Sequence, residues 1–222
     1  MMAQIVADRE IAGNADGLPP TGCYQALLPN EHWEALPRAV KRRFGAEACE
    51  DRKEPKIYVG YIITHRQNWA GKLLAQIIRP FGAPLPLDTK EGDATIVSVL
   101  DNATGNGQIW SRLYARQAGV PQVIQSTKTF SGPTGLEEFI GLGLSIPLAL
   151  HATNRGLEFK SSTIRLNMLG RTITSPRQIC AGLLKVVHRD EGDDEFTFIM
   201  SLEHPVFGDL MYLEARYRDD VV

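Results

Sequence analysis

The residues best suited to chemistry lie on one predicted strand, from Gln108 to Arg116. Because strand side chains alternate, Trp110, Arg112, Tyr114 and Arg116 share one face. An inward orientation would give a wall with a rigid aromatic ring, a fixed cation and a phenol. Such a wall suits an amphipathic ligand with a carboxylate or enolate end. If the smaller, mostly apolar opposite face packs on the core instead, these side chains face solvent, and alternation alone leaves both orientations open.

Proton transfer needs a group that titrates near neutral pH, and the histidines are the first candidates. His65, His151 and His188 each lie near the end of a predicted strand, where they could reach the rim of a cavity. Asp101 follows a strand and precedes a turn, so capping of that turn competes with a role as general base. The candidate catalytic residues are His65, Asp101 and Tyr114, and the candidate ligand-binding residues are Trp110, Arg112, Tyr61 and His151.

Several common chemistries find no support in the sequence. Ser126, Ser131 and Ser145 lack the context of a nucleophile elbow. No pair of Cys or His residues has metal-ligand spacing, so we expect no metal. A Gly-x-Gly-x-x-Gly fingerprint is absent, and we expect no nucleotide cofactor. The three widely spaced cysteines suggest reduced thiols and a cytoplasmic location.

The composition is that of an ordinary globular protein. The chain has 222 residues, of which 43% are hydrophobic and 23% are charged, and its net charge is -2. A balance so close to neutral provides no basic field for nucleic acid. No apolar run is long enough to span a bilayer, and the first residues lack the pattern of a secretory signal. We expect a flexible, Gly- and Pro-punctuated arm over residues 1–20 and a single α+β domain over residues 21–222.

Two helical segments are predicted before the strands dominate. An apolar stripe of Trp33, Leu36, Val40 and Phe44 predicts a helix from an N-cap at Asn30 to a stop at Gly45, kinked or split at Pro37. The basic run at 41–43 near its end is expected to be solvated. A second helix should begin after Asn68, with Trp69, Leu73 and Ile77 on one side, and end before Pro80. The Pro-rich apolar loop over residues 80–86 could cover a sheet or close the mouth of a cavity.

The remaining chain predicts eight or nine strands joined mostly by short turns, which indicates an antiparallel sheet. We expect one long strand over residues 137–152, bent at Gly141 and Gly143 so that the sheet curls, and another over residues 157–169 with a bulge. Residues 170–181 are a predicted connection with a short helical turn, and Glu137-Glu138 is expected to be solvated. Strands over residues 183–188 and 195–203 should form a hairpin. In the second of these, four apolar side chains share one face, which we expect to be packed and separate from any site: Phe196, Phe198, Met200 and Leu202.

Four short motifs, in this order and spacing, resemble those of a bacterial family, the domain of unknown function 4166. They are Leu73-Leu74-Ala75-Gln76-Ile77-Ile78 with Phe81-Gly82-Ala83-Pro84-Leu85-Pro86; Trp110-Ser111-Arg112-Leu113-Tyr114; Leu169-Gly170 before Ser175-Pro176; and Phe196-Thr197-Phe198 through His204-Pro205-Val206-Phe207-Gly208. The resemblance runs from about residue 23 to residue 218. It implies no settled activity and no catalytic residues. Members of the family occur alone or behind a saccharopine-dehydrogenase-like Rossmann domain, and this chain resembles a stand-alone member.

Together these observations predict an α+β protein with a large curved antiparallel sheet or partly closed barrel, lipocalin-like or helix-grip-like. Two or three helices, mostly N-terminal, would accompany it. The leading hypothesis is a cavity for a hydrophobic or amphipathic small molecule, in a carrier or in a metal-independent cyclase or isomerase. In the enzyme, Arg112 would hold an anion while Tyr114 or His65 moves a proton. The alternative is a non-catalytic module that docks on a separate dehydrogenase-like protein, an analogy with the fused relatives.

Overall fold

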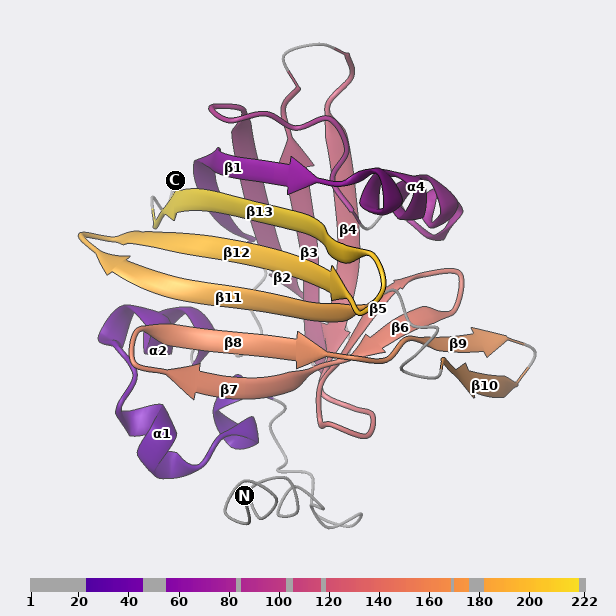
Figure 1. The fold of residues 1–222 in the computed structure, drawn as a ribbon. Helices are drawn as coiled ribbons and strands as arrows, with labels where there is room; N and C mark the ends of the chain where they lie inside the picture. Colours follow the sequence, from indigo (N-terminus) through magenta and orange to yellow (C-terminus); the bar gives the residue numbers. More distant parts are fainter. Residues whose placement is uncertain are drawn as a thin grey trace, which may run out of the picture.

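The computed structural model describes residues 23–45, 55–82, 85–102, 106–116, 119–168, 170–175 and 182–219. The predicted arm over residues 1–20 lies outside them. The described residues form a thirteen-stranded antiparallel sheet, curled into a half-barrel, and three α-helices, two of them N-terminal (Figure 1). The predicted α+β class with a curved antiparallel sheet is confirmed, whereas the predicted number of strands was too low.

Strand β1 joins the two halves of the sheet, because it pairs with β2 on one side and with β13 on the other. Its strands are β1 Lys56–Gln67, β2 Ala94–Asp101, β3 Gly107–Tyr114, β4 Gln122–Thr129, β5 Glu137–Gly141, β6 Leu144–Pro147, β7 Ala149–Thr153, β8 Gly156–Ser161, β9 Arg165–Met168, β10 Arg171–Thr174, β11 Leu183–Gly192, β12 Glu195–His204 and β13 Gly208–Arg218. Their order across the sheet is β10-β9-β6-β5-β4-β3-β2-β1-β13-β12-β11-β8-β7. Residues 56–61 of β1 pair with β2 and residues 59–67 with β13, and the register shifts between Ile62 and Thr64. Figure 1 shows β13, β12, β11, β8 and β7 running across β2, β3 and β4, which lie behind them.

The single long strand predicted over residues 137–152 is wrong, because the segment contains three strands. Leu142 and Gly143 have φ values of 45° and 80°, which close a tight hairpin between β5 and β6. The chain then crosses to the other end of the sheet, where β7 pairs with β8. The glycines therefore reverse the chain where we had expected a bend.

The segment after residue 156 also divides further than predicted. The strand expected over residues 157–169 breaks after Ser161 and resumes as β9 at Arg165, at the place where its apolar side chains change phase. Arg171–Thr174 forms β10 and pairs with β9, so the helical turn expected over residues 170–181 is wrong for these residues. Residues 176–181 lie outside the described part of the chain.

The N-terminal helices cover one end of the sheet. A 3-10 helix, η1 (Tyr24–Leu27), precedes α1 (Asn30–Glu34) and α2 (Arg38–Phe44), and Pro37 separates the two α-helices as predicted. The N-cap of α1 is Pro29, so the cap predicted at Asn30 is one residue late. The stripe predicted from the sequence is buried in the main hydrophobic core: Trp33, Leu36, Val40 and Phe44. These side chains seal this end of the half-barrel.

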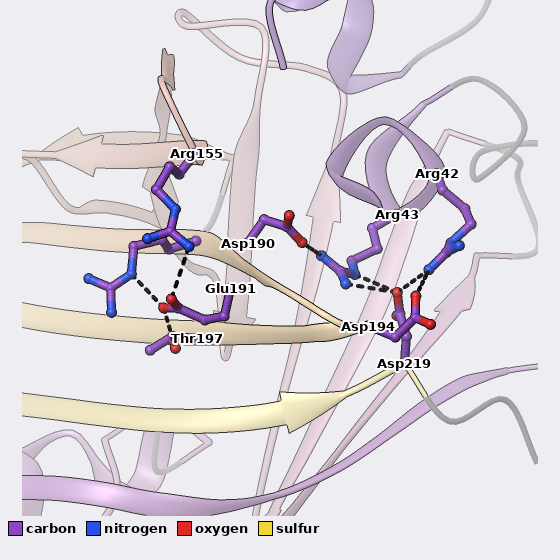
Figure 2. A network of polar contacts seen from close by, with 9 residues as sticks. Arg42, Arg43, Arg155, Asp190, Glu191, Asp194, Thr197 and Asp219 are labelled. Carbon is purple, nitrogen blue, oxygen red and sulfur yellow. Dashed lines mark hydrogen bonds and ion pairs between the residues drawn. The ribbon is translucent and has the colours of Figure 1, made fainter. Parts of the chain in front are cut away.

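Ion pairs fix α2 to the end of the sheet, which corrects the expectation of a solvated basic turn (Figure 2). The Arg43 side chain is 3% exposed and pairs with Asp219 at 2.8 Å and with Asp190 at 3.2 Å. Arg42 is more exposed and reaches Asp219 at 2.6 Å and Asp194 at 2.9 Å. Asp219 thus receives two guanidinium groups, which lower the pKa of its carboxyl against the opposing effect of burial.

Helix α4 (Trp69–Ile77) lies at the other end of the sheet and leads into a 3-10 helix, η2 (Arg79–Phe81) (Figure 1). Its predicted N-cap is confirmed, because the Asn68 side chain accepts a hydrogen bond from the Gly71 N–H at 2.8 Å. The inner side of α4 packs into a second core cluster with residues of the following loop and of β12 and β13. The helix ends before Pro80, as predicted.

Candidate functional site

A cavity lies between the two halves of the sheet. Its volume is about 110 Å³, counted as the space open to the centre of a water molecule, which is several times what one water needs. Strands β3, β4, β5 and β6 supply one side, and β8, β11 and β12 supply the other. Leu74 and Ile78 reach it from α4, and Leu85 reaches it from the Pro-rich loop. The loop that was expected to cover a sheet or close the mouth of a cavity therefore contributes one side chain to the cavity lining.

The structure selects the inward orientation of the strand that carries the predicted chemistry. Trp110, Arg112 and Tyr114 of β3 all line the cavity. Trp110 and Tyr114 are buried, and the Arg112 side chain is 12% exposed. Three of the seven candidate residues are therefore brought together on one wall.

Three further polar side chains join Arg112 on this wall. The Glu138 carboxylate of β5 forms two ion pairs through Oε1, with Lys128 of β4 at 3.1 Å and with Arg112 of β3 at 3.4 Å. The Ser126 hydroxyl donates to the same oxygen at 2.5 Å and accepts from Arg112 Nη1 at 3.2 Å. We call Arg112, Ser126, Lys128 and Glu138 the polar cluster. Its members come from three adjacent strands, and the sheet register sets them side by side.

The indole ring of Trp110 lies beside both cations of the polar cluster. The Lys128 ammonium lies 4.5 Å from the centre of its indole ring, and the Arg112 guanidinium lies 5.7 Å from it. Both distances permit cation–π attraction. With two cations and one carboxylate, the cluster carries a surplus of one positive charge on a lining that is otherwise mostly apolar.

Burial and neighbouring charges together shift the pKa values of Lys128 and Glu138 in the polar cluster. Burial lowers the pKa of Lys128 to about 8, although the Glu138 carboxylate opposes the change. Burial alone would raise the pKa of Glu138, but Lys128, Arg112 and the Ser126 hydrogen bond lower it to about 2. Close to neutral pH, Glu138 is therefore ionised, while Lys128 can exchange a proton. Burial also raises the pKa of Tyr114, which keeps its phenol protonated.

The other four candidate residues lie away from the cavity lining. The His65 Nδ1 atom lies 2.7 Å from the Thr89 hydroxyl, in the region of β1 that leads toward α4. Asp101 ends β2, and its carboxylate accepts a hydrogen bond from Gln108. Tyr61 and His151 are exposed. The structure does not bring these residues to the polar cluster, and their proposed roles remain predictions.

Lys128, Glu138 and Ser126 are the members of the cluster that the sequence analysis overlooked. We expected Glu137-Glu138 to be solvated, but Glu137 is buried and the Glu138 side chain is only 13% exposed. The Glu137 carboxylate instead accepts hydrogen bonds from Ser145 at 2.7 Å and from Arg165 at 2.9 Å. The sequence did contain one signal for Ser126 and Lys128. They occupy every second position of β4 together with Ile124, so two polar side chains share a strand face with an apolar one.

The apolar face of β12 serves as a wall of the cavity as well as a packed face. Phe198, Met200 and Leu202 line the cavity opposite the polar cluster. Our expectation that this face would be separate from the site was therefore wrong. Phe196, the fourth member, packs toward the N-terminal helices and lines a smaller neighbouring cavity of about 20 Å³.

His188, one of the three histidines expected to reach the rim of a cavity but not among the seven chosen candidates, is buried and lines the smaller cavity. The His188 ring stacks on Phe196 at 4.6 Å and meets the edge of Phe44 at 4.8 Å. Burial, reinforced by the nearby Arg43 charge, lowers its pKa to about 3. The ring is therefore neutral over the physiological range and behaves as part of the aromatic core.

Among the described residues there is neither a cluster of metal-binding side chains nor a helix able to span a membrane. Over these segments, no group of three or more His, Cys, Asp or Glu side chains is arranged to hold a metal ion. Among the helices that the structure describes, none has the length and apolar character needed to cross a membrane.

The family model described as domain of unknown function (DUF4166) matches residues 36–216, which is most of the chain. The matched range includes β1 to β12, most of β13, and every residue of the polar cluster. No curated protein and no solved structure matches the chain significantly.

Proposed function

The chain belongs to the DUF4166 family of domains of unknown function, and we propose that it binds an amphipathic small molecule with a carboxylate or a similar anionic group. The observation that carries this proposal is the surplus positive charge of the polar cluster in a cavity whose remaining lining is mostly apolar. A buried charge is costly unless it is paired. An anionic ligand would pair the remaining cation and place its apolar part against β12 and α4.

Arg112 is the residue best placed to hold the anion. Its guanidinium makes contacts of 3.2 Å with Ser126 and 3.4 Å with Glu138, and it has five N–H donors in a planar fork. Such a fork matches the two oxygens of a carboxylate. Lys128 adds a second cation beside it, and Trp110 supplies a rigid edge to the binding surface.

Mass spectrometry of small molecules that co-purify with the natively folded protein tests this proposal. We expect an anionic amphiphile in the wild-type protein and much less of it in Arg112→Met. The proposal fails if no small molecule co-purifies and no member of a library of lipids and organic acids raises the melting temperature.

The near-neutral pKa of Lys128 favours a second, catalytic candidate in the same cavity. A group that titrates close to neutral pH can move protons in either direction, and the protonated Tyr114 phenol lies on the same wall. These residues would suit a metal-independent cyclisation or isomerisation. In deuterium oxide, such an enzyme would exchange a carbon-bound hydrogen of the co-purified ligand, and Lys128→Met would abolish the exchange. A ligand that binds without exchange would leave the protein as a carrier.

The outer face of the sheet supports the alternative of a docking module. Val59 pairs with Ile96, Ile96 with Leu113, and Leu113 with Val123, so an apolar row crosses β1 to β4. Val59, Ile96 and Val123 are exposed. A row of this kind can mark a protein-binding surface. Co-expression with a saccharopine-dehydrogenase-like protein would then yield a complex that Val59→Gln/Val123→Gln disrupts, and the absence of a complex would count against the alternative.

A further inference from the structure

Helix α4 has apolar side chains on two opposite sides. On the inner side, Leu74 and Ile78 line the cavity. On the outer side, Trp69, Leu73 and Ile77 have exposed fractions of 69%, 54% and 60%. Three large apolar side chains at helical spacing on the water-facing side of a helix are not explained by the packing of this fold.

The turn between β12 and β13 extends this outer side. Phe207 meets the Trp69 ring edge to face at 5.7 Å, and its backbone carbonyl accepts a hydrogen bond from the Asn68 side chain at 2.9 Å. Val206, next to it, is 76% exposed. We call Trp69, Leu73, Ile77, Val206 and Phe207 the α4 face. Its two parts are held together by these contacts, so the apolar surface is continuous.

The charges around the α4 face favour a lipid surface as its occupant. No acidic residue occurs between Asn68 and Gly82, and the exposed Lys72 and Arg79 flank the apolar side chains. Glu203 and Asp209 line a polar groove beside the turn, but Arg66 shares that groove, so cations outnumber carboxylates around the face. Basic side chains next to exposed Trp, Phe and Leu are the pattern of helices that lie in a membrane interface.

From this combination we propose that the α4 face docks on an anionic lipid surface. Docking would place the apolar side chains at the headgroup boundary and Lys72 and Arg79 among the headgroups. Leu74 and Ile78 would then lie between the membrane and the cavity, where an amphipathic molecule could pass from one to the other. The docking proposal rests only on the α4 face and does not depend on what the cavity binds.

Co-sedimentation with phosphatidylcholine vesicles, with and without phosphatidylglycerol, tests the proposal. We expect wild-type protein to sediment with the mixed vesicles, and Leu73→Gln/Ile77→Gln to lose roughly tenfold or more in affinity because two apolar side chains no longer enter the interface. Lys72→Gln should bind the mixed vesicles roughly fivefold more weakly, the effect of one basic residue near an anionic surface. Val59→Gln/Val123→Gln is the matched control, since it removes exposed apolar side chains from the sheet and should bind like wild type.

Tryptophan fluorescence gives a readout local to the α4 face. Of the three tryptophans, Trp33 and Trp110 are buried, so a vesicle-induced blue shift should disappear in Trp69→Phe. Wild-type protein that stays in the supernatant with both kinds of vesicle would overturn the proposal, and so would a double variant that sediments like wild type. A wild-type dimer in sedimentation velocity that Leu73→Gln/Ile77→Gln converts to a monomer, without vesicle binding, would also overturn it by assigning the face to a second copy of the chain.

Discussion

Lys128 and Glu138 face each other across the β4–β5 pair, with Nζ and Oε1 3.1 Å apart inside the cavity. Their side chains are only 7% and 13% exposed. Each ion is therefore stabilised chiefly by its partners, and Glu138 is the only carboxylate shared by Lys128 and Arg112 in the polar cluster. Removing one member of such a set costs far more than removing an exposed pair.

Glu138→Gln should therefore destabilise the protein by about 3–5 kcal/mol, because it leaves Lys128 and Arg112 buried without a carboxylate. Equilibrium unfolding in urea measures the change. Glu34→Gln is the control, since Glu34 is 72% exposed in its pair with Lys41 and should cost less than about 1 kcal/mol. Equal effects of the two substitutions would contradict a buried, charged cluster.

His188 should make the protein less stable in mild acid. Its folded pKa of about 3 lies below its ordinary value of 6.5, so between these values the unfolded chain binds a proton that the folded chain does not. Lowering the pH through this window favours unfolding, by about 1.4 kcal/mol for each pH unit. In His188→Phe this part of the pH dependence should vanish, whereas other groups such as Asp219 still titrate. Parallel stability–pH curves for the two proteins would contradict this account, because they would show that folding does not shift the pKa of His188.

The ion pairs of the two neighbouring arginines on α2 should differ sharply in their contribution to stability. Arg43→Met leaves Asp219 and Asp190 without a buried partner and should cost about 3–5 kcal/mol. Arg42→Met removes a side chain that is 59% exposed and should cost less than about 1 kcal/mol. Urea unfolding of both variants measures the difference. If Arg42→Met were the more harmful change, the anchoring of α2 shown in Figure 2 would need another explanation.

Alanine substitutions at two glycines with similar φ values distinguish backbone strain from steric overlap. Gly143 and Gly170 have φ values of 80° and 73°, where an alanine costs about 1–2 kcal/mol. A Cβ at Gly143 would lie 2.1 Å from the Asn167 carbonyl oxygen, whereas one at Gly170 would meet nothing within 4 Å. Gly143→Ala should therefore lower the melting temperature clearly more than Gly170→Ala. Equal shifts would mean that β6 and β9 are not packed as closely as described.

The sequence predicted the fold best where a local pattern decides the outcome. Alternation located the strand that carries Trp110 and Arg112, Pro37 separated α1 from α2, and Asn68 capped α4 as expected. The strand prediction failed for residues 137–153, because the two glycines Gly141 and Gly143 are compatible with either a bent strand or a tight turn. Which of these forms depends on the partner strands, β9 on one side and β8 on the other, and local sequence does not specify them.

The candidate site was only partly predictable for a related reason. Trp110, Arg112 and Tyr114 lie on one strand, so their shared face follows from alternation. Lys128 and Glu138 come from two other strands, and only the register of the sheet sets them against Arg112. The position of Glu138 beside Arg112 therefore depends on the pairing of strands that are distant in sequence. Two adjacent glutamates at the start of a strand gave no local sign that they would be buried.

Isothermal titration with decanoate and decanol tests the central claim, that the cavity binds an amphipathic anion through the polar cluster. Wild-type protein should bind decanoate roughly tenfold or more tightly than decanol, because only the acid pairs with the surplus cation. Arg112→Met should remove this preference, and Arg155→Met, which alters an arginine on the surface, should retain it. Equal affinity for the two compounds, or a preference that survives Arg112→Met, would contradict the claim.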